Sequence, residues 1–214
     1  MTRIILIRHG QSEANVLDYF AGHSDYPLSE LGHRQAEKTA EFLDSTPIDR
    51  IFSSDLPRAF MTAEHIARRK GLSIETDCRL REILAGDWEG VSFAEIREKF
   101  PNEYRTWFSD IGNGGCPGGE STAQLWARFV PAAEELAAEN DGKTICITTH
   151  ATSLRVLECA WKNLPLERMV EIPWISNAAV TVVDYDPATC TAQFLQRDQN
   201  SHLAELATAL PDNI

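Results

Sequence analysis

The chain begins with a short apolar run that is followed at once by charged and polar residues. Residues 4–7 read Ile-Ile-Leu-Ile, and Arg8, His9 and Gly10 come directly after them. A continuous, mostly β-branched run of this kind is typical of a strand that is covered on both faces of a sheet. In open α/β sheets, ligands bind at the carboxyl ends of such strands. We therefore expect a buried first strand that ends in a guanidinium and an imidazole, with Gly10 letting the chain turn.

Predicted strands and helices alternate along most of the chain and are joined by short links. The other predicted strands are residues 51–52, 72–76 and 144–148, followed by a hairpin that pairs 178–185 with 191–195 around Asp186-Pro187. The predicted helices begin after Ser29, after Asp55-Leu56 and after Ser121, and a further helix passes through 154–157. This alternation predicts an α/β protein, a three-layer sandwich with a mostly parallel central sheet and helices on both faces. No linker or repeat divides the chain, so we expect a single domain over residues 1–214.

Capping boxes are predicted at the starts of two helices. Ser121 and Gln124, like Ser92 and Glu95, have the spacing of a capping box. The helix that begins after Ser121 contains Pro131, which lacks the N–H that a helix interior needs. We therefore expect Pro131 to kink or interrupt that helix.

The segment from about residue 81 to 120 breaks the alternation and forms an insertion. It is rich in aromatic residues: Trp88, Phe93, Phe100, Tyr104, Trp107 and Phe108. A long excursion of this kind is usually held together by a small core of its own. We expect most of these aromatic residues to form that core and a minority to line a pocket over the active site.

The composition excludes several classes of partner. There are 32 acidic and 20 basic residues, which give a formal net charge of -12. This charge repels nucleic acid and anionic lipid surfaces, so we expect neither as a partner. No stretch approaches the roughly 18 apolar residues of a membrane span, and no leader precedes the first strand, which predicts a cytoplasmic protein. The five cysteines are odd in number and show no Cys-x-x-Cys pair, which favours free thiols.

Histidine ends two of the predicted strands. His9 closes the first strand, and His150 follows the strand at residues 144–148. Parallel strands open onto the same edge of the sheet, so the two rings are expected to face each other across a crevice. Arg58 lies in the first turn of the helix after another strand. Because guanidinium groups and helix N-termini bind anions, Arg8 and Arg58 suit one shared phosphate.

Six segments, taken together, resemble the histidine phosphatase superfamily, also called the phosphoglycerate-mutase-like family. They are residues 8–15 (RHGQSEAN), 25–32 (DYPLSELG) with Gln35-Ala36, 53–59 (SSDLPRA) with Thr62-Ala63, Glu82 with 86–90 (GDWEG), 118–121 (GGES) and 149–150 (TH). Each alone is a weak signal, but six in the order of the family, over nearly the whole chain, are specific. The resemblance implies an acid-type histidine phosphatase, a phosphoric monoester hydrolase that needs no metal and no other cofactor.

The resemblance also implies a catalytic role for five residues. His9 would attack phosphorus through one ring nitrogen and form a phosphohistidine, while its other ring nitrogen donates to a backbone carbonyl. Arg8, Arg58 and a protonated His150 would hold the phosphoryl oxygens as their charge develops. Glu82 would protonate the leaving group and then accept a proton from the water that hydrolyses the phosphohistidine.

Further residues are placed at the substrate by the same resemblance. The implied substrate-binding residues are Arg8, Asn15, Ala21, Gly22, Arg58, Glu82, His150 and Ala151. Asn15 would act as a neutral donor to the phosphoryl oxygens. Ala151 departs from the family pattern, in which glycine often follows the second histidine, and its methyl group would crowd the floor of the pocket or alter the approach of the next amide.

Glu89 competes with Glu82 for the role of the acid. The family motif places the acid ahead of Gly86 and uses Glu89, beside Trp88, in the turn that follows, which favours Glu82. The other four histidines lack metal-ligand spacing and are expected on the surface or on helix faces: His23, His33, His65 and His202.

Hydrolysis is favoured over two alternative functions. Phe93 stands where cofactor-dependent phosphoglycerate mutases carry a lysine, and Arg105 is the one arginine where those mutases carry a pair. Such a mutase is the first alternative, and a non-catalytic phosphate-binding module is a remote one, because all the catalytic residues are present. Phe93, Tyr104 and Trp107 could give the leaving group an apolar wall. The substrate, a small organic phosphomonoester, and a possible homo-oligomeric state are left open by the sequence.

Overall fold

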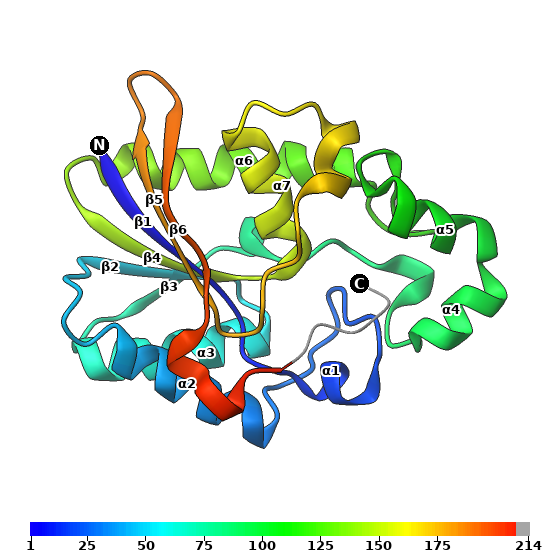
Figure 1. The fold of residues 1–214 in the computed structure, drawn as a ribbon, viewed down its shortest axis with the longest axis horizontal. Helices are drawn as coiled ribbons and strands as arrows, with labels where there is room; N and C mark the ends of the chain where they lie inside the picture. The colour runs from blue at the N-terminus through cyan, green and yellow to red at the C-terminus, as the bar shows by residue number, and fades with distance from the viewer. Residues whose placement is uncertain (209–214) are drawn as a thin grey trace.

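The computed structural model describes residues 1–208, and a six-stranded sheet lies at its centre (Figure 1). The strands are β1 (Thr2–Arg8), β2 (Arg50–Ser53), β3 (Ile74–Thr76), β4 (Thr144–Thr149), β5 (Val180–Asp186) and β6 (Thr191–Gln199). Their order across the sheet is β3-β2-β4-β1-β5-β6. The first four are parallel to one another, whereas β5 is antiparallel to β1 and to β6. The predicted mostly parallel sheet and the late hairpin are confirmed.

Helices cover both faces of this sheet, as predicted. They are α1 (Glu13–Leu17), α2 (Glu30–Phe42), α3 (Pro57–Lys70), α4 (Phe93–Lys99), α5 (Pro101–Ser109), α6 (Thr122–Glu139) and α7 (Ala151–Trp161). In Figure 1, α6 and α7 lie on one side of the sheet, α2 and α3 lie on the other, and α4 and α5 extend beyond it. That residues 1–214 form a single domain stays a prediction, because residues 209–214 lie outside the described ones.

The side chains of β1 explain why both faces need a cover. Ile4 and Leu6 belong to the larger core cluster, whereas Ile5 and Ile7 belong to the cluster on the opposite face, and all four are buried. Successive residues of a strand point to opposite faces of the sheet, so an uninterrupted apolar run is buried only if both faces are covered. Each such side chain contributes about 1.5–3 kcal/mol by leaving water.

Local signals set the ends of α2 and α3 as the sequence predicts. The Ser29 hydroxyl caps α2 by accepting the N–H of Gly32 at 3.1 Å. Pro57 occupies the first turn of α3, and the helix ends at Gly71, which has a left-handed φ of 66°. These caps satisfy helix-end backbone groups that would otherwise lack partners.

The two predicted capping boxes differ in outcome. Ser121 and Gln124 form the complete, reciprocal box at the start of α6. At α4 the Ser92 hydroxyl accepts the N–H of Glu95 at 3.2 Å but also donates to its carboxylate at 2.9 Å, so the box is incomplete. The helix α6 continues through Pro131 without interruption. Packing of its apolar face outweighs the one hydrogen bond that the proline removes.

Gly10 serves a different purpose from the predicted one. The φ of Gly10 is not positive, so the backbone conformation of the turn does not itself require glycine. A Cβ atom at this position would lie 2.6 Å from the carbonyl oxygen of Gly32 in α2. Glycine is therefore needed because α2 approaches the loop after β1 closely.

The five cysteines are free thiols, as their spacing predicts. Within the described part of the chain, no helix has the length and apolar character that crossing a bilayer requires. The cytoplasmic location stays a prediction.

Candidate active site

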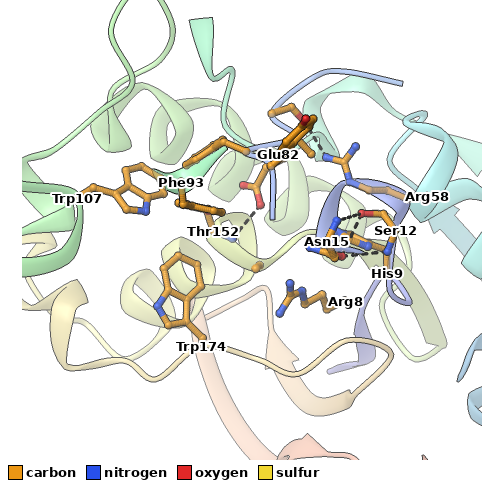
Figure 2. A pocket seen from close by; sticks show the side chains of 15 residues that line it. Arg8, His9, Ser12, Asn15, Arg58, Glu82, Phe93, Trp107, Thr152 and Trp174 are labelled. Atoms are coloured by element: carbon orange, nitrogen blue, oxygen red, sulfur yellow. Dashed lines mark hydrogen bonds between the residues drawn. The ribbon is translucent and has the colours of Figure 1, made fainter. Parts of the chain in front are cut away.

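The predicted site residues gather at the carboxyl ends of β1 and β4 (Figure 2). Parallel pairing places Arg8 of β1 opposite Thr149 of β4, and the N–H of His9 donates to the Thr149 carbonyl at 3.0 Å. The next residue on each strand is therefore a histidine at the same edge. The ring centroids of His9 and His150 are 5.2 Å apart.

Most of the predicted substrate-binding residues line one pocket. They are Arg8, Asn15, Ala21, Gly22, Arg58, Glu82 and Ala151, together with His9. His150 is fully buried in contact with His9 and does not form part of the pocket wall. The structure therefore brings together the side chains that the sequence predicted, with His150 behind the ring of His9.

The hydrogen bonding of His9 determines which of its nitrogens can react. Its Nδ1 lies 2.7 Å from the carbonyl oxygen of Gly10. Because a carbonyl oxygen can only accept, Nδ1 carries the hydrogen and Nε2 carries the free lone pair. Burial, followed by the charges of Arg58 and Arg8, lowers the pKa of His9 well below its usual 6.5. The ring is therefore neutral at physiological pH, with a nucleophilic Nε2.

Arg8 and Arg58 are buried and are held by backbone carbonyls. Arg8 Nη1 donates to Ile175 O at 2.6 Å, and Arg58 donates from Nη1 to Ser24 O at 3.1 Å and from Nη2 to Gly22 O at 2.8 Å. Neither forms an ion pair with any residue in 1–208. Burial lowers the pKa of each to about 10, so both remain charged at neutral pH. Two positive charges without counter-ions thus lie beside the nucleophile.

Three buried nitrogens around the pocket lack a hydrogen-bond partner among the described residues. They are Arg8 Nε, Arg58 Nε and His150 Nδ1. More than about 90% of buried polar groups in proteins are satisfied, and leaving one unsatisfied costs about 1–3 kcal/mol. Their gathering beside His9 is typical of a site built to bind an oxyanion.

The charge of His150 depends on whether an anion lies beside it. Its Nε2 lies 2.8 Å from the Ser54 hydroxyl oxygen. Burial, followed by the positive charge of Arg58, lowers the pKa of His150 well below 6.5, so the ring is neutral beside the arginines. Only a neighbouring anion could restore the protonated form that the family resemblance implies.

We expect the rings of His9 and His150 to be neutral at pH 6.5, where a free imidazole is half-protonated, because burial lowers the pKa of both. The ¹⁵N chemical shifts of the rings, assigned with the variants His9→Gln and His150→Gln, measure this directly. Addition of orthovanadate at constant pH should then protonate His150. Half-protonation of either ring near pH 6.5 in the free protein would contradict the expected shift.

The amide of Asn15 is oriented by three donors. Its Oδ1 accepts from Ser12 N and Ser12 Oγ, both at 3.0 Å, and from Asn177 Nδ2 at 3.4 Å. With the oxygen occupied in this way, the amide nitrogen remains for the pocket. Asn15 can therefore donate to an anion there without adding charge.

Glu82 is fixed at the start of α7 by contacts to both its carboxylate and its backbone. The carboxylate accepts the N–H of Ile83 at 2.8 Å and that of Thr152 at 3.1 Å. Its backbone carbonyl accepts from His23 Nε2 at 2.7 Å and from Arg128 Nη2 at 3.0 Å. His23, expected at the surface or on a helix face, is half-buried and holds the backbone beside the acid.

Glu89, the competing acid, serves a structural purpose. Its Oε1 accepts the N–H of His23 at 2.8 Å and that of Ala85 at 3.0 Å, and its Oε2 accepts from Ser24 N and Oγ. Gly22, with a φ of +48°, is needed here because a Cβ would lie 2.1 Å from Glu89 Oε1. Glu89 thus fastens the loop whose carbonyls bind Arg58, and it does not line the pocket.

The far end of the pocket is aromatic. Figure 2 shows Phe93, Trp107 and Trp174 on the side away from Arg8, His9 and Arg58. The remaining aromatic residues of the insertion pack against the larger core cluster, as expected: Trp88, Phe100, Tyr104 and Phe108. The prediction that Tyr104 joins the wall is wrong, because its ring packs against Phe108 with the centroids 4.5 Å apart.

Five lining residues were missed by the sequence analysis: Ser12, Tyr19, Phe20, Thr152 and Trp174. Ser12, Tyr19 and Phe20 flank α1 and Asn15, and Thr152 follows Ala151, so their nearness in sequence was a usable signal. Trp174 lies in an irregular stretch far from every motif. No local pattern could have indicated that it returns to the pocket.

Comparison with known proteins assigns the family. The sequence model of the histidine phosphatase superfamily (branch 1) matches residues 4–198. The chain belongs to this superfamily. It is a histidine phosphatase that acts on small phosphate esters.

Its relatives cover most of its length. Phosphoserine phosphatase 1 of Hydrogenobacter thermophilus is 33% identical over 183 residues, which are 86% of this chain and 86% of that protein. Glucosyl-3-phosphoglycerate phosphatase of Mycobacterium tuberculosis is 34% identical over 187 residues, 84% of this chain and 83% of that protein. The structure of Bacillus stearothermophilus YhfR matches this histidine phosphatase with a TM-score of 0.89 at 30% identity, over 95% of this chain and 100% of that one.

Proposed function

We propose that this phosphatase hydrolyses small organic phosphomonoesters through a phosphohistidine formed on His9, without a metal ion. The observation that supports this most is the free Nε2 of a neutral His9 beside three unpartnered nitrogens, on Arg8, Arg58 and His150. The first is a nucleophile, the two guanidinium Nε–H groups are donors for the oxyanion it attacks, and His150 Nδ1 is a further donor once the ring is protonated.

The first step transfers the phosphoryl group to the protein. His9 Nε2 attacks phosphorus, a P–N bond forms, and the P–O bond to the leaving group breaks. Arg8, Arg58, His150 and Asn15 bind the remaining phosphoryl oxygens, whose charge a metal ion would balance in other phosphoryl-transfer enzymes. Glu82, in its protonated form, gives its proton to the leaving oxygen, which departs as an alcohol.

The second step releases phosphate. Glu82, now ionised, accepts a proton from a water molecule as the water oxygen attacks phosphorus. The P–N bond breaks, and its electron pair returns to His9 Nε2. One carboxyl group can serve both steps because the second is the chemical reverse of the first, with water in place of the alcohol.

The aromatic end of the pocket supports hydrolysis over the mutase alternative. A mutase must retain a second anionic group on its substrate, and the pocket has no lysine there, since Phe93, Trp107 and Trp174 line that side. The relatives named above act on phosphoserine and on glucosyl-3-phosphoglycerate. We infer a small phosphomonoester of this kind as the substrate class.

Rapid acid-free quenching tests the proposal. A ³²P-labelled phosphomonoester should label the protein within one turnover, and the label should be acid-labile and alkali-stable, as expected of a phosphohistidine. Excess EDTA should change neither the labelling nor the steady-state rate, because guanidinium groups bind the phosphoryl oxygens. Strict dependence of turnover on an added divalent ion would overturn the proposal.

A second assay separates the alternatives. Incubation with 3-phosphoglycerate and catalytic 2,3-bisphosphoglycerate should yield inorganic phosphate rather than 2-phosphoglycerate. Isomerisation faster than phosphate release would favour the mutase. Tight binding of orthovanadate with no turnover of any phosphomonoester would favour the non-catalytic module.

A further inference from the structure

A second hollow adjoins the active-site pocket and shares two walls with it. Trp107 and Trp174 line both. The volume inside the second hollow is about 200 Å³. Its other lining residues are apolar except for Arg155: Phe108, Ile111, Val170, Ile172 and Pro173. Apolar side chains around one or a few polar groups are the usual lining of a small-molecule binding site.

Arg155 is rigidly held at the wall of this hollow. It lies on α7, its side chain is buried, and it donates from Nε to Ile172 O and from Nη2 to Met169 O, both at 2.8 Å. Its guanidinium carbon lies 4.1 Å from the ring centroid of Trp174. Burial lowers the pKa of Arg155 to about 10, so it is charged at neutral pH.

No carboxylate of residues 1–208 pairs with this charge. The neighbouring Glu158 is already bound by Lys162 at 2.7 Å and by Arg197 at 2.8 Å. Arg155 Nη1 has no hydrogen-bond partner among the described residues, and Arg155 is one of the residues that line the hollow. A buried charge without a counter-ion is costly, which suggests that a ligand supplies one.

The position of the hollow suits the leaving group of the substrate. Figure 2 shows Trp107 and Trp174 on the side of the pocket away from His9, farther from it than Glu82. In the proposed reaction Glu82 faces the leaving oxygen, so a leaving group bound there extends toward the two tryptophans. The second hollow continues this path.

We propose that the second hollow is a specificity subsite in which Arg155 binds a carboxylate carried on an apolar part of the leaving group. One guanidinium balances one negative charge, and Arg155 Nη1 can donate a charge-assisted hydrogen bond to a carboxylate, whereas a second phosphate dianion would need more cations. The inference rests on the proposed function, because it takes the phosphate to lie at His9.

A matched pair of substrates tests the subsite. The wild-type protein should hydrolyse 3-(4-phosphonooxyphenyl)propanoate with a kcat/KM roughly 10- to 100-fold higher than that of its neutral primary amide, from one charge-assisted pair. In Arg155→Met this ratio should fall to about one, and in Arg155→Lys it should recover in part. The shorter benzoate and phenylacetate homologues are measured alongside, because the distance from the phosphate to the carboxylate that suits Arg155 is one of the variables tested.

The ratio separates binding from structural support. If Arg155 only anchors the carbonyls of Met169 and Ile172, its loss lowers both rates together and leaves the ratio unchanged, which overturns the proposal. A ratio near one in the wild-type protein for every homologue also overturns it. Arg168→Met is the matched control, because Arg168 is exposed and pairs with Glu171, so its ratio should stay at the wild-type value.

Failure of the proposed function is distinguishable from failure of the subsite. Hydrolysis of the amide depends on His9 and does not involve Arg155. If the wild-type protein hydrolyses neither substrate, the proposed reaction itself is contradicted. The corresponding phosphonates, which cannot be hydrolysed, are compared by calorimetry. Tighter binding of the carboxylate phosphonate than of its amide supports the subsite, and equal binding contradicts it, even if the protein hydrolyses neither phosphate ester.

Discussion

Replacing His9 with alanine should lower kcat for phosphomonoester hydrolysis by roughly 10⁴-fold or more and abolish phosphoprotein labelling, because loss of a nucleophile removes the whole covalent route. The lone pair of Nε2 is available only because Nδ1 is bound to Gly10 O and burial keeps the ring neutral. Among the described residues, His9 alone provides an imidazole to the pocket wall. Steady-state rates and rapid-quench labelling measure both effects.

Controls distinguish loss of chemistry from loss of fold. His9→Gln keeps a polar side chain near Gly10 O and should be equally inactive, while orthovanadate still binds through Arg8 and Arg58. His33→Ala removes an exposed histidine and should retain activity. Residual labelling in His9→Ala that follows the wild-type time course would show that another residue is the nucleophile.

Replacing Glu82 with glutamine should lower kcat/KM for alkyl phosphates by roughly 10²- to 10⁴-fold, the usual contribution of a general acid. The effect should be much smaller for p-nitrophenyl phosphate, whose leaving group departs as an anion. Glutamine retains an oxygen that can accept the N–H of Ile83 or Thr152, so the local backbone should persist. The measurement is kcat/KM for a series of phosphomonoesters with leaving groups of rising basicity. The logarithm of kcat/KM should fall more steeply with basicity in Glu82→Gln than in the wild-type protein.

The same series tests the competing carboxyl group. Glu89→Gln should weaken the loop at residues 22–24, because four donors converge on this carboxylate. Its activity should therefore fall by a similar factor for every leaving group, together with a lower melting temperature. If the loss of kcat/KM rose steeply with leaving-group basicity in Glu89→Gln and not in Glu82→Gln, Glu89 would be the general acid and Glu82 would not.

The strands, helices and catalytic motif were predictable because their signals are local. The run at residues 4–7 requires a doubly covered strand, and β1 is that strand. Ser29, Pro57 and Gly71 mark helix ends through backbone groups within a few residues. Where a local rule failed, packing overrode it, as at Pro131 inside α6.

The details of the pocket were less accessible, because they depend on residues far apart in the chain. Arg8 is held by the carbonyl of Ile175, which lies 167 residues away. Asn177 reaches the amide of Asn15 from a separation of 162 residues. Tyr104 was assigned to the wall from its place in the insertion, but the fold of α5 turns it against Phe108.

The α/β class, the family and the candidate catalytic residues His9, Arg8, Arg58, Glu82 and His150 can be predicted from the amino-acid sequence, because apolar periodicity and short motifs are patterns of neighbouring residues. The packing of distant segments is what buries His150 against His9, gives Glu89 its structural contacts, and brings Trp174 to both the pocket and the hollow at Arg155. Burial, charge balance and cavity shape arise when distant segments pack together, so no stretch of sequence contains them.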